Sequence, residues 1–376
     1  MPPDQRLIAA MRRKILIVEL WGLGDLTFST PVIAAALASG DEVHLLGKPH
    51  AKELLGPSFP DLKFIPCNAP WTAYRGKYKL WRWDGLGLSR LLVRLRAEKY
   101  DVAVSVRNDP RDRLLMLLIG ARERIGFAQK SLRTYFGLGR MFLTKRMERL
   151  KAKQHKVEDW RQIGGEIGLS AAVIADPVLD RTRYTTERVD CIFASVNKPV
   201  LCLHTGARIA VRRWPEKYFL QIIASLRESY DFHLIVIPEP QTLPSALTGI
   251  ADVSLTDLSI HELTDVLGRS DLLLCNDSGP GHIAAACGRP VISIFGPSDP
   301  DWFRPWGGLH KVVLRDICPW RPCFDYCKFS EPYCMTHLLP QTVWPEVDGH
   351  IRKLIASGAL PDRLVKNTAQ LADTRA

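Results

Sequence analysis

The sequence lacks any apolar run long enough to span a bilayer. Nowhere in its 376 residues does a stretch approach the roughly 20 consecutive apolar residues that a transmembrane helix requires. Residues 1–14 hold one short apolar run, residues 7–10, and lack the longer apolar region and cleavage site of a signal peptide. We therefore expect a cytoplasmic protein, and leave open a peripheral contact with the inner face of the plasma membrane.

Regularly paired cysteines are also lacking. The chain has nine cysteines, and an odd number in a long chain without an export signal does not indicate a disulfide framework. Cys318, Cys323, Cys327 and Cys334 lie close together in sequence, but their spacing contains no C-x-x-C pair of the kind typical of zinc sites. We expect packed thiols, no metal and no cofactor, although the sequence alone leaves a metal at these four cysteines open.

Acidic residues are scarce in one part of the chain. The net charge is +11, and residues 107–156 contain fourteen Lys and Arg against four Asp and Glu. Such an excess attracts phosphorylated lipids, nucleotides, nucleic acids or a membrane face, although a solvated basic surface is the simpler interpretation. No recognised nucleic-acid-binding pattern is present, so we expect no nucleic-acid partner. Arg107, Arg111 and Lys130 are our candidates for contact with an anionic acceptor.

Short apolar runs alternate with amphipathic segments along most of the chain. We predict strands at residues 14–20, 42–46, 62–65, 101–105, 199–204, 232–237, 271–275 and 291–295. We predict helices at residues 25–39, 86–98, 111–119, 215–229, 261–269, 280–287 and 342–357. This alternation indicates parallel sheets that are covered by helices on both faces.

The chain is too long for one ordinary hydrophobic core. Its length, and a less periodic segment at residues 176–190, predict two doubly wound, Rossmann-like α/β domains at residues 12–180 and 186–360, with a frayed tail at 361–376. In such sheets ligands bind beyond the carboxyl ends of the strands, where the strand order reverses. We expect the two domains to face each other across a cleft.

The first candidate loop follows the first predicted strand. Gly22 and Gly24 allow the backbone to turn tightly and to approach a ligand closely. The loop is not a dinucleotide fingerprint, because the third glycine of G-x-G-x-x-G would fall at Thr27. Asp25 is either a helix N-cap, which Asp favours, or a carboxylate that acts as a general base.

The second candidate loop, residues 276–282, reads Asn-Asp-Ser-Gly-Pro-Gly-His and follows an apolar strand. Pro280 suits the first turn of a helix, and Ser278 or Gly279 suits its cap. The N–H groups of such a helix start, together with the helix dipole, can hold a diphosphate without a metal. The alternative is a well-capped short helix with no ligand.

Two further segments have functional and structural interpretations. Arg208, Arg212 and Arg213 precede a Trp-Pro pair, and guanidinium groups suit phosphate oxygens, but a solvated basic loop is the alternative. Trp71, Trp81 and Trp83 stand among basic residues, which suits an acceptor loop near a membrane or a loop that packs on its own domain.

Taken in order, these segments resemble glycosyltransferase family 9, the heptosyltransferases of lipopolysaccharide core assembly. The resemblance extends from about residue 14 to the last predicted helix. It is carried by residues 14–18 with Gly-Leu-Gly-Asp at 22–25, Arg-Arg-Trp-Pro-Glu at 212–216, residues 276–282 with two alanines at 284–285, and Gly-Pro-Ser-Asp-Pro at 296–300. The spacing of the last two segments is the most specific part.

The resemblance implies a GT-B fold and an inverting transfer of a sugar, such as heptose from ADP-heptose, to a lipopolysaccharide core or related anionic glycolipid. It implies acceptor binding by the N-terminal domain and donor binding by the C-terminal domain. Asp25 would be the general base, and Glu239 would contact the ribose. The residues implied to bind the donor and its phosphates are Gly24, Arg212, Asp277, Ser278, Gly279, Pro280, Gly281 and His282.

Two other functions stay open at this point. A sugar-nucleotide epimerase of the same fold would need further carboxylates and histidines at the ligand site. A basic nucleic-acid-binding protein would bind DNA or RNA with a steep dependence on salt.

Overall fold

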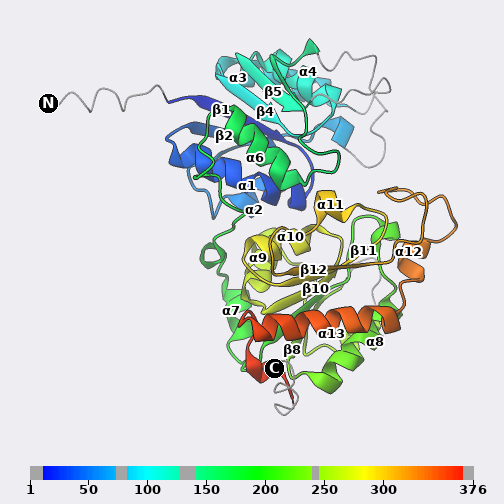
Figure 1. Ribbon diagram of the computed structural model, residues 1–376. Helices are drawn as coiled ribbons and strands as arrows, with labels where there is room; N and C mark the ends of the chain where they lie inside the picture. Colours follow the sequence, from blue (N-terminus) through cyan, green and yellow to red (C-terminus); the bar gives the residue numbers. More distant parts are fainter. Residues whose placement is uncertain (1–11, 73–82, 128–140, 239–244, 367–376) are drawn as a thin grey trace. The chain divides into compact units, whose positions relative to one another are not determined.

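The computed structural model describes residues 12–72, 83–127, 141–238 and 245–366. The chain divides into two compact units, Met1–Pro177 and Val178–Ala376. Each unit is built on its own six-stranded sheet (Figure 1). Among the described residues, no helix combines the length and the apolar character needed to cross a membrane.

The first unit contains a parallel sheet with the strand order β3-β2-β1-β4-β5-β6. Its strands are β1 Lys14–Glu19, β2 Glu42–Gly47, β3 Lys63–Pro66, β4 Val102–Ser105, β5 Glu123–Phe127 and β6 Lys145–Met147. Its helices are α1 Leu23–Ala38, α2 His50–Leu55, α3 Gly85–Ala97, α4 Pro110–Ile119 and α6 Lys156–Glu166, with a 3-10 turn at η2 Pro70–Thr72.

The second unit contains a parallel sheet with the order β12-β11-β10-β7-β8-β9. Its strands are β7 Val200–His204, β8 His233–Ile237, β9 Val253–Ser254, β10 Leu272–Asn276, β11 Val291–Phe295 and β12 His310–Leu314. Its α-helices are α7 Glu187–Phe193, α8 Glu216–Ser229, α9 Ile260–Arg269, α10 Gly279–Ala286, α11 Pro300–Phe303, α12 Tyr333–Thr336 and α13 Pro340–Ala356. Its 3-10 turns are η5 Arg181–Arg183, η6 Ala210–Arg212, η8 Ala246–Gly249 and η9 Asp362–Leu364.

The central strands are buried on both faces, which explains their continuous apolar sequence. In the first unit Leu16 and Val18 of β1 share a core with Leu95 of α3 and Leu115 of α4. Helices α1 and α6 pack together elsewhere on the same unit (Figure 1). In the second unit α8 and α13 pack together, as do α9 and α10 (Figure 1). The predicted doubly wound α/β architecture is confirmed in both units.

The strand order reverses once in each sheet. The chain starts in a central strand, moves outward to one edge, and then returns to the other side of that central strand. The reversal lies between β1 and β4 in the first unit and between β7 and β10 in the second. Loops that follow these four strands therefore occupy the position where doubly wound sheets bind ligands.

The region around the predicted linker belongs to the second unit from Val178 onward. It contains η5 and α7, and the Thr186 amide donates to the Asp265 carboxylate at 2.9 Å. The far end of the chain is also packed. Leu364 is buried, and Val365 forms an antiparallel bridge with Tyr230. Residues 362–365, which we predicted to be part of a frayed tail, are therefore packed on the second unit.

Candidate functional site

The first predicted loop connects β1 to α1 at the reversal point of the first sheet. Gly22 is the N-cap of α1 and has an extended backbone. Asp25 lies in the first helical turn, and one oxygen of its carboxylate accepts from the Gly22 amide at 3.3 Å. A carboxylate there is also stabilised by the helix dipole. Asp25 is therefore not the N-cap itself, but from the third helical position it accepts from the N-cap amide. Its side chain is partly exposed, so it also remains within reach of a ligand.

Glu19, which we did not select from the sequence, lies at the end of β1 beside this loop. It is 1% exposed. Its Oε1 accepts from the Trp21 amide at 3.0 Å, whereas Oε2 has no hydrogen-bond partner among the described residues. Burial, with a further contribution from the Asp25 charge, raises the pKa of Glu19 to about 8. The only signal in the sequence was a single charged residue closing an apolar run.

Arg107 reaches the same loop from the end of β4. Its side chain is buried, and its guanidinium lies 4.7 Å from the centre of the Trp21 ring. One guanidinium nitrogen is 2.9 Å from the buried Asp112 carboxylate, which also accepts from the Trp71 indole at 2.8 Å. Burial raises the pKa of Asp112 to about 6. Arg107 therefore contacts the loop that carries Asp25, but its charge is shared with an internal partner.

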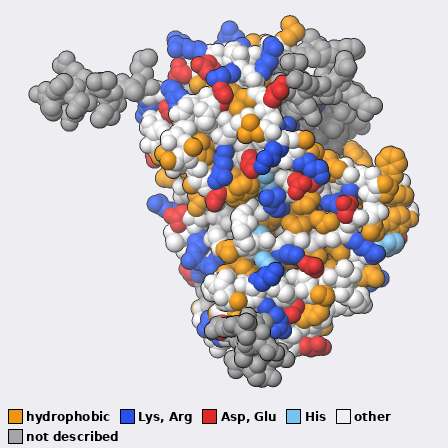
Figure 2. All heavy atoms as spheres, viewed as in Figure 1, with side chains coloured by type: hydrophobic (Ala, Val, Ile, Leu, Met, Phe, Trp, Pro, Cys, Tyr) orange, Lys and Arg blue, Asp and Glu red, His pale blue; other side chains and the backbone are white. Residues whose placement is uncertain are grey.

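Arg111 and Lys130 were the other two residues predicted to contact an anionic acceptor. Arg111 is partly exposed and pairs with the Asp109 carboxylate at 2.7 Å. Lys130 lies outside the described residues. On the face that Figure 2 shows, Lys and Arg side chains are interspersed with Asp and Glu. The described Lys and Arg side chains therefore form no single-sign patch on this face.

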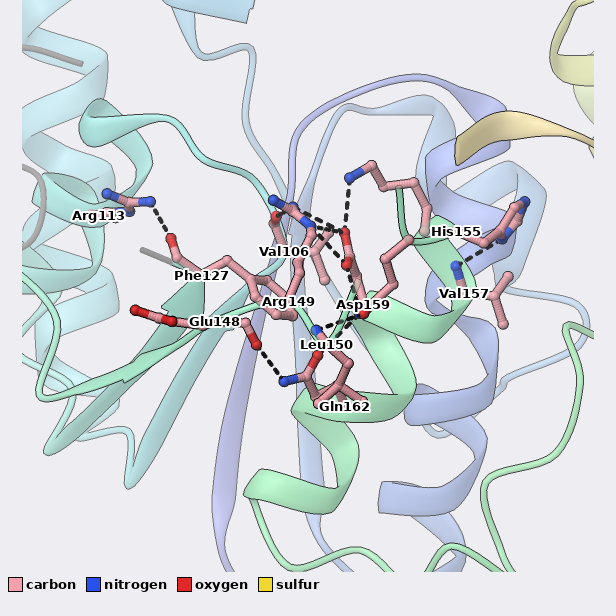
Figure 3. A network of polar contacts seen from close by, with 12 residues as sticks. Val106, Arg113, Phe127, Glu148, Arg149, Leu150, His155, Val157, Asp159 and Gln162 are labelled. Carbon is pink, nitrogen blue, oxygen red and sulfur yellow. Dashed lines mark hydrogen bonds and ion pairs between the residues drawn. The ribbon is translucent and has the colours of Figure 1, made fainter. Parts of the chain in front are cut away.

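Some of the basic side chains in residues 107–156 form ion pairs and hydrogen bonds within the first unit. Arg149 binds both oxygens of the fully buried Asp159 carboxylate, at 2.9 to 3.1 Å (Figure 3). Lys156 binds the same carboxylate at 2.8 Å. Arg113, which is also buried, donates to the Phe127 carbonyl (Figure 3). These side chains stabilise the unit and are not available to an acceptor.

The aromatic segment of the first unit contributes to its core. Trp71 is 6% exposed, and Trp83 packs on the same cluster with ring centres 5.8 Å apart. Trp81 lies outside the described residues. For Trp71 and Trp83 the structure therefore favours the interpretation as a loop packed on its domain over that of a membrane-facing loop.

The second predicted loop connects β10 to α10 at the reversal point of the second sheet. Ser278 is the N-cap of α10, but its hydroxyl donates back to the Asn276 carbonyl at 3.1 Å, so no side chain caps the helix. Gly281 allows α10 to lie against the sheet, because a Cβ there would stand 3.1 Å from the Cys275 sulfur. His282 is buried in the same turn. A helix start without a side-chain cap suits an anion.

Asn276 ties this loop to the loops that follow β7. Its side-chain oxygen accepts from the Trp214 amide at 3.0 Å, and its side-chain nitrogen donates to the Thr205 carbonyl at 2.7 Å. Trp214 is anchored in turn through its indole, which donates to the Leu338 carbonyl at 2.8 Å. Residues 205–214 and the start of α10 are thus held together on one side of the second sheet.

Arg212, predicted to bind phosphate, is held between two carboxylates. Its guanidinium is 3.2 Å from Asp277 and 3.0 Å from Asp325, and it also donates to the Phe324 carbonyl. The Ser298 hydroxyl donates to the same Asp277 carboxylate. Asp277 is 5% exposed, and burial raises its pKa, an effect that Arg212 opposes. Asp325 was not foreseen, since nothing near it in sequence points to Arg212.

Two other positions bear on a bound phosphate. Arg208 lies on the loop after β7, is exposed, and has no ion pair among the described residues. Arg213 donates to the Ala207 carbonyl at 2.9 Å and so braces that loop. Glu239, implied to contact the ribose, lies outside the described residues.

The four neighbouring cysteines are free thiols. Cys334 is buried, and Cys318, Cys323 and Cys327 are partly exposed. Burial raises the pKa of Cys334 to about 11. Within the described ranges, no group of three or more His, Cys, Asp or Glu side chains is arranged to hold a metal ion.

Solved structures share this architecture. The chain aligns over 89% of its length with 99% of E. coli heptosyltransferase WaaC, crystallised with ADP-2-deoxy-2-fluoro heptose, at a TM-score of 0.68 and 18% identity. It also aligns over 92% of its length with 77% of TibC from enterotoxigenic E. coli, an iron-containing dodecameric glycosyltransferase, at a TM-score of 0.54 and 15% identity. The GT-B fold is therefore confirmed, and the absence of a metal stays a prediction.

Sequence comparison agrees with the fold. The chain is 24% identical to lipopolysaccharide heptosyltransferase 1 of Pseudomonas aeruginosa, over 89% of this chain and 97% of that protein. The sequence profile of glycosyltransferase family 9 (heptosyltransferase) matches residues 88–334, which include Arg212 and residues 276–282 but not Asp25. Since the match covers more than half of the chain, the protein belongs to glycosyltransferase family 9 and is a glycosyltransferase.

Proposed function

We propose that the protein transfers a heptose from ADP-heptose to a lipopolysaccharide core acceptor, with inversion at the anomeric carbon. Family membership supports the reaction class. The name of the Pseudomonas relative supports the acceptor, and the sugar nucleotide in the E. coli structure supports the donor. The acceptor would be an anionic glycolipid met at the inner face of the membrane, with Arg107 and Arg111 near it.

The observation that carries this proposal is the start of α10, which has no side-chain cap and lies at the reversal point of the second sheet. The diphosphate of the donor would accept from backbone N–H groups around Ser278 and Gly279. Arg208 would add a positive charge. These groups stabilise the negative charge that develops as ADP leaves. Residues 186–360 would form the donor domain.

Asp25 would supply the proton chemistry from the acceptor domain, residues 12–180. Its carboxylate takes the proton of an acceptor hydroxyl while that oxygen attacks the anomeric carbon. The bond from that carbon to the diphosphate oxygen breaks, and its electron pair leaves with ADP. A single displacement of this kind inverts the anomeric centre and needs no enzyme nucleophile.

The test is a donor screen with purified protein. ADP-, GDP- and UDP-sugars are incubated with lipopolysaccharide core acceptor, and both glycosylated acceptor and released nucleotide are measured. We expect transfer with ADP-heptose and little with the other donors. A protein that consumes a sugar nucleotide without glycosylating any acceptor, and releases an epimerised sugar nucleotide, would disprove the proposal.

We further propose that the transfer needs no metal, since helix N–H groups and Arg208 supply the positive charge at the leaving group. Dialysis against a chelator should change the rate of transfer by less than about twofold. This is far below the tenfold loss that corresponds to about 1.4 kcal/mol of activation free energy. Metal analysis of the dialysed protein is the control. Loss of transfer that iron restores would contradict metal independence and would implicate the four-cysteine segment.

A further inference from the structure

Glu19 is a buried carboxyl group that the proposed chemistry does not use. It ends β1 in register with Gly47 of β2, and it is 1% exposed. Oε1 receives the Trp21 amide at 3.0 Å, and Oε2 is buried without a hydrogen-bond partner among the described residues. An ionised carboxylate that is buried with one unpaired oxygen is strongly disfavoured.

The charges around Glu19 come from each neighbouring element. The charges that act on Glu19 itself are Asp25 of α1, Arg107 after β4 and Asp112 of α4. The next charges outward are Asp109, which pairs with Arg107 and Arg111, and Lys48, which acts on His50 after β2. Arg107 is the cation that acts on Glu19, but it lies 2.9 Å from Asp112 and 3.5 Å from Asp109. His50 contacts the Trp21 backbone, and burial lowers its pKa. Little positive charge therefore remains to offset a second anion beside Asp25.

We propose that Glu19 is held as the neutral acid, and that with Asp25 it forms a carboxyl pair in which the proton stays on Glu19. Glu19 is then a positioning residue. It holds the Trp21–Gly22 turn through the Trp21 amide, and the Gly22 amide in turn binds Asp25. This inference rests on the proposed role of Asp25 as the base.

The titration of Glu19 agrees with this geometry. Burial is the largest cause that raises its pKa to about 8, and the Asp25 charge is the next. At neutral pH the proton stays on Glu19, so Glu19 cannot accept the proton of the acceptor hydroxyl. Above pH 8 the pair would carry two negative charges, which opposes the approach of an anionic acceptor and strains the turn. We expect transfer to decline there.

A direct test follows the acid form of Glu19 by its infrared carbonyl band. At pH 7 the band should be present in wild type and lost in Glu19→Gln. Asp25→Asn should move its midpoint to lower pH, because the variant removes a repelling charge. Glu42→Gln is the control, since the pKa of Glu42 is lowered to about 2 and its loss should leave the band unchanged. An ionised Glu19 at pH 7, or a midpoint that Asp25→Asn does not move, would overturn the pair.

A second test uses the pH profile of transfer with ADP-heptose and core acceptor. Glu19→Gln should lower kcat by less than about threefold at pH 7, because Gln has the shape and the neutral charge of the protonated acid, and should abolish the decline above pH 8. Glu19→Ala should lose more activity than Glu19→Gln, since Gln keeps the acceptor for the Trp21 amide. A decline above pH 8 that persists in Glu19→Gln would contradict the assignment.

The two tests separate this inference from the proposed function. If Asp25→Asn retains full transfer, the base is wrong, whatever the infrared titration shows. If Asp25→Asn is inactive but leaves the Glu19 midpoint unchanged, the role of Asp25 as the base is supported and the proposed Glu19–Asp25 pair is disproved.

Discussion

Asp25 and Arg208 both present side chains that are at least partly exposed at their loops. Asp25 accepts from the N-cap amide of its own helix yet is partly exposed, and Arg208 is exposed without an ion pair among the described residues. Arg107 and Arg212, by contrast, are engaged with carboxylates. Charge type alone therefore does not identify the residues that meet substrate.

Asp25→Asn should abolish transfer and spare donor binding. The amide keeps the shape of the side chain but cannot take a proton, so we expect a loss of at least about 100-fold in kcat. The affinity for ADP, measured by calorimetry, should change little because the proposed donor site belongs to the other unit. Asp61→Asn, in the same unit, is the control. A fully active Asp25→Asn would show that another group is the base.

Arg208→Gln should weaken the donor specifically. Loss of one charge-assisted contact to the diphosphate should raise the donor KM about tenfold, or about 1.4 kcal/mol. Arg363→Gln, an exposed arginine of the same unit, controls for the change in net charge. Steady-state kinetics with varied ADP-heptose measure the effect. Equal KM values for the two variants would remove Arg208 from the donor site.

At the scale of elements, the loop between β12 and α12 is tied to the start of α10 through Arg212. Asp325 and the Phe324 carbonyl come from that loop, and Asp277 comes from the end of β10. The loop is also held at Pro297, whose carbonyl accepts from the Cys323 and Phe324 amides at 3.0 Å. A donor phosphate that uses Arg212 must compete with these carboxylates.

Asp325→Asn should therefore favour donor binding. Removal of one carboxylate lowers the negative charge near the diphosphate and frees part of the Arg212 guanidinium, so we expect a donor KM lower by about threefold to tenfold. Glu331→Gln removes an exposed charge from the same loop and is the matched control. A higher KM in Asp325→Asn would mean that Asp325 holds Arg212 in its binding position.

At the scale of the whole molecule, stability and catalysis are linked through Glu19. Its pKa is about 8 in the folded protein and near the ordinary value of 4.5 in the unfolded chain. The folded state therefore binds the extra proton between these values. The contribution of this proton on Glu19 to the free energy of unfolding is fully present below pH 4.5 and is lost as the pH rises toward 8.

Wild type should accordingly lose stability relative to Glu19→Gln between pH 5 and 8. The difference in the free energy of unfolding should change by up to about 1.4 kcal/mol per pH unit and level off above pH 8. Denaturant unfolding at several pH values measures it. For Glu42→Gln, whose carboxylate is ionised throughout this range, the difference from wild type should stay flat. A flat difference for Glu19→Gln would refute a neutral buried acid.

Much of the architecture follows from the sequence. Apolar runs such as residues 14–20 and 271–275 predict buried strands of a parallel sheet, and β1 and β10 lie there. The bounds of the predicted helices agree with those of the structure to within a few residues, as for α8, which was predicted at 215–229. Strands β5, β6, β9 and β12, three of them at sheet edges, were not predicted, because they are short or carry polar residues that give no clear period.

The sequence by itself determined the alternation of elements, the two glycine-bearing loops and the family to which the chain belongs, since these depend on local order along the chain. Only the tertiary structure decided which charges are paired. Arg212 pairs with Asp325, which is 113 residues away in sequence. Glu19 is shielded from water by strands and helices that are distant in sequence. A pKa and an ion pair depend on burial and neighbours in space. Residue type and spacing do not supply that information.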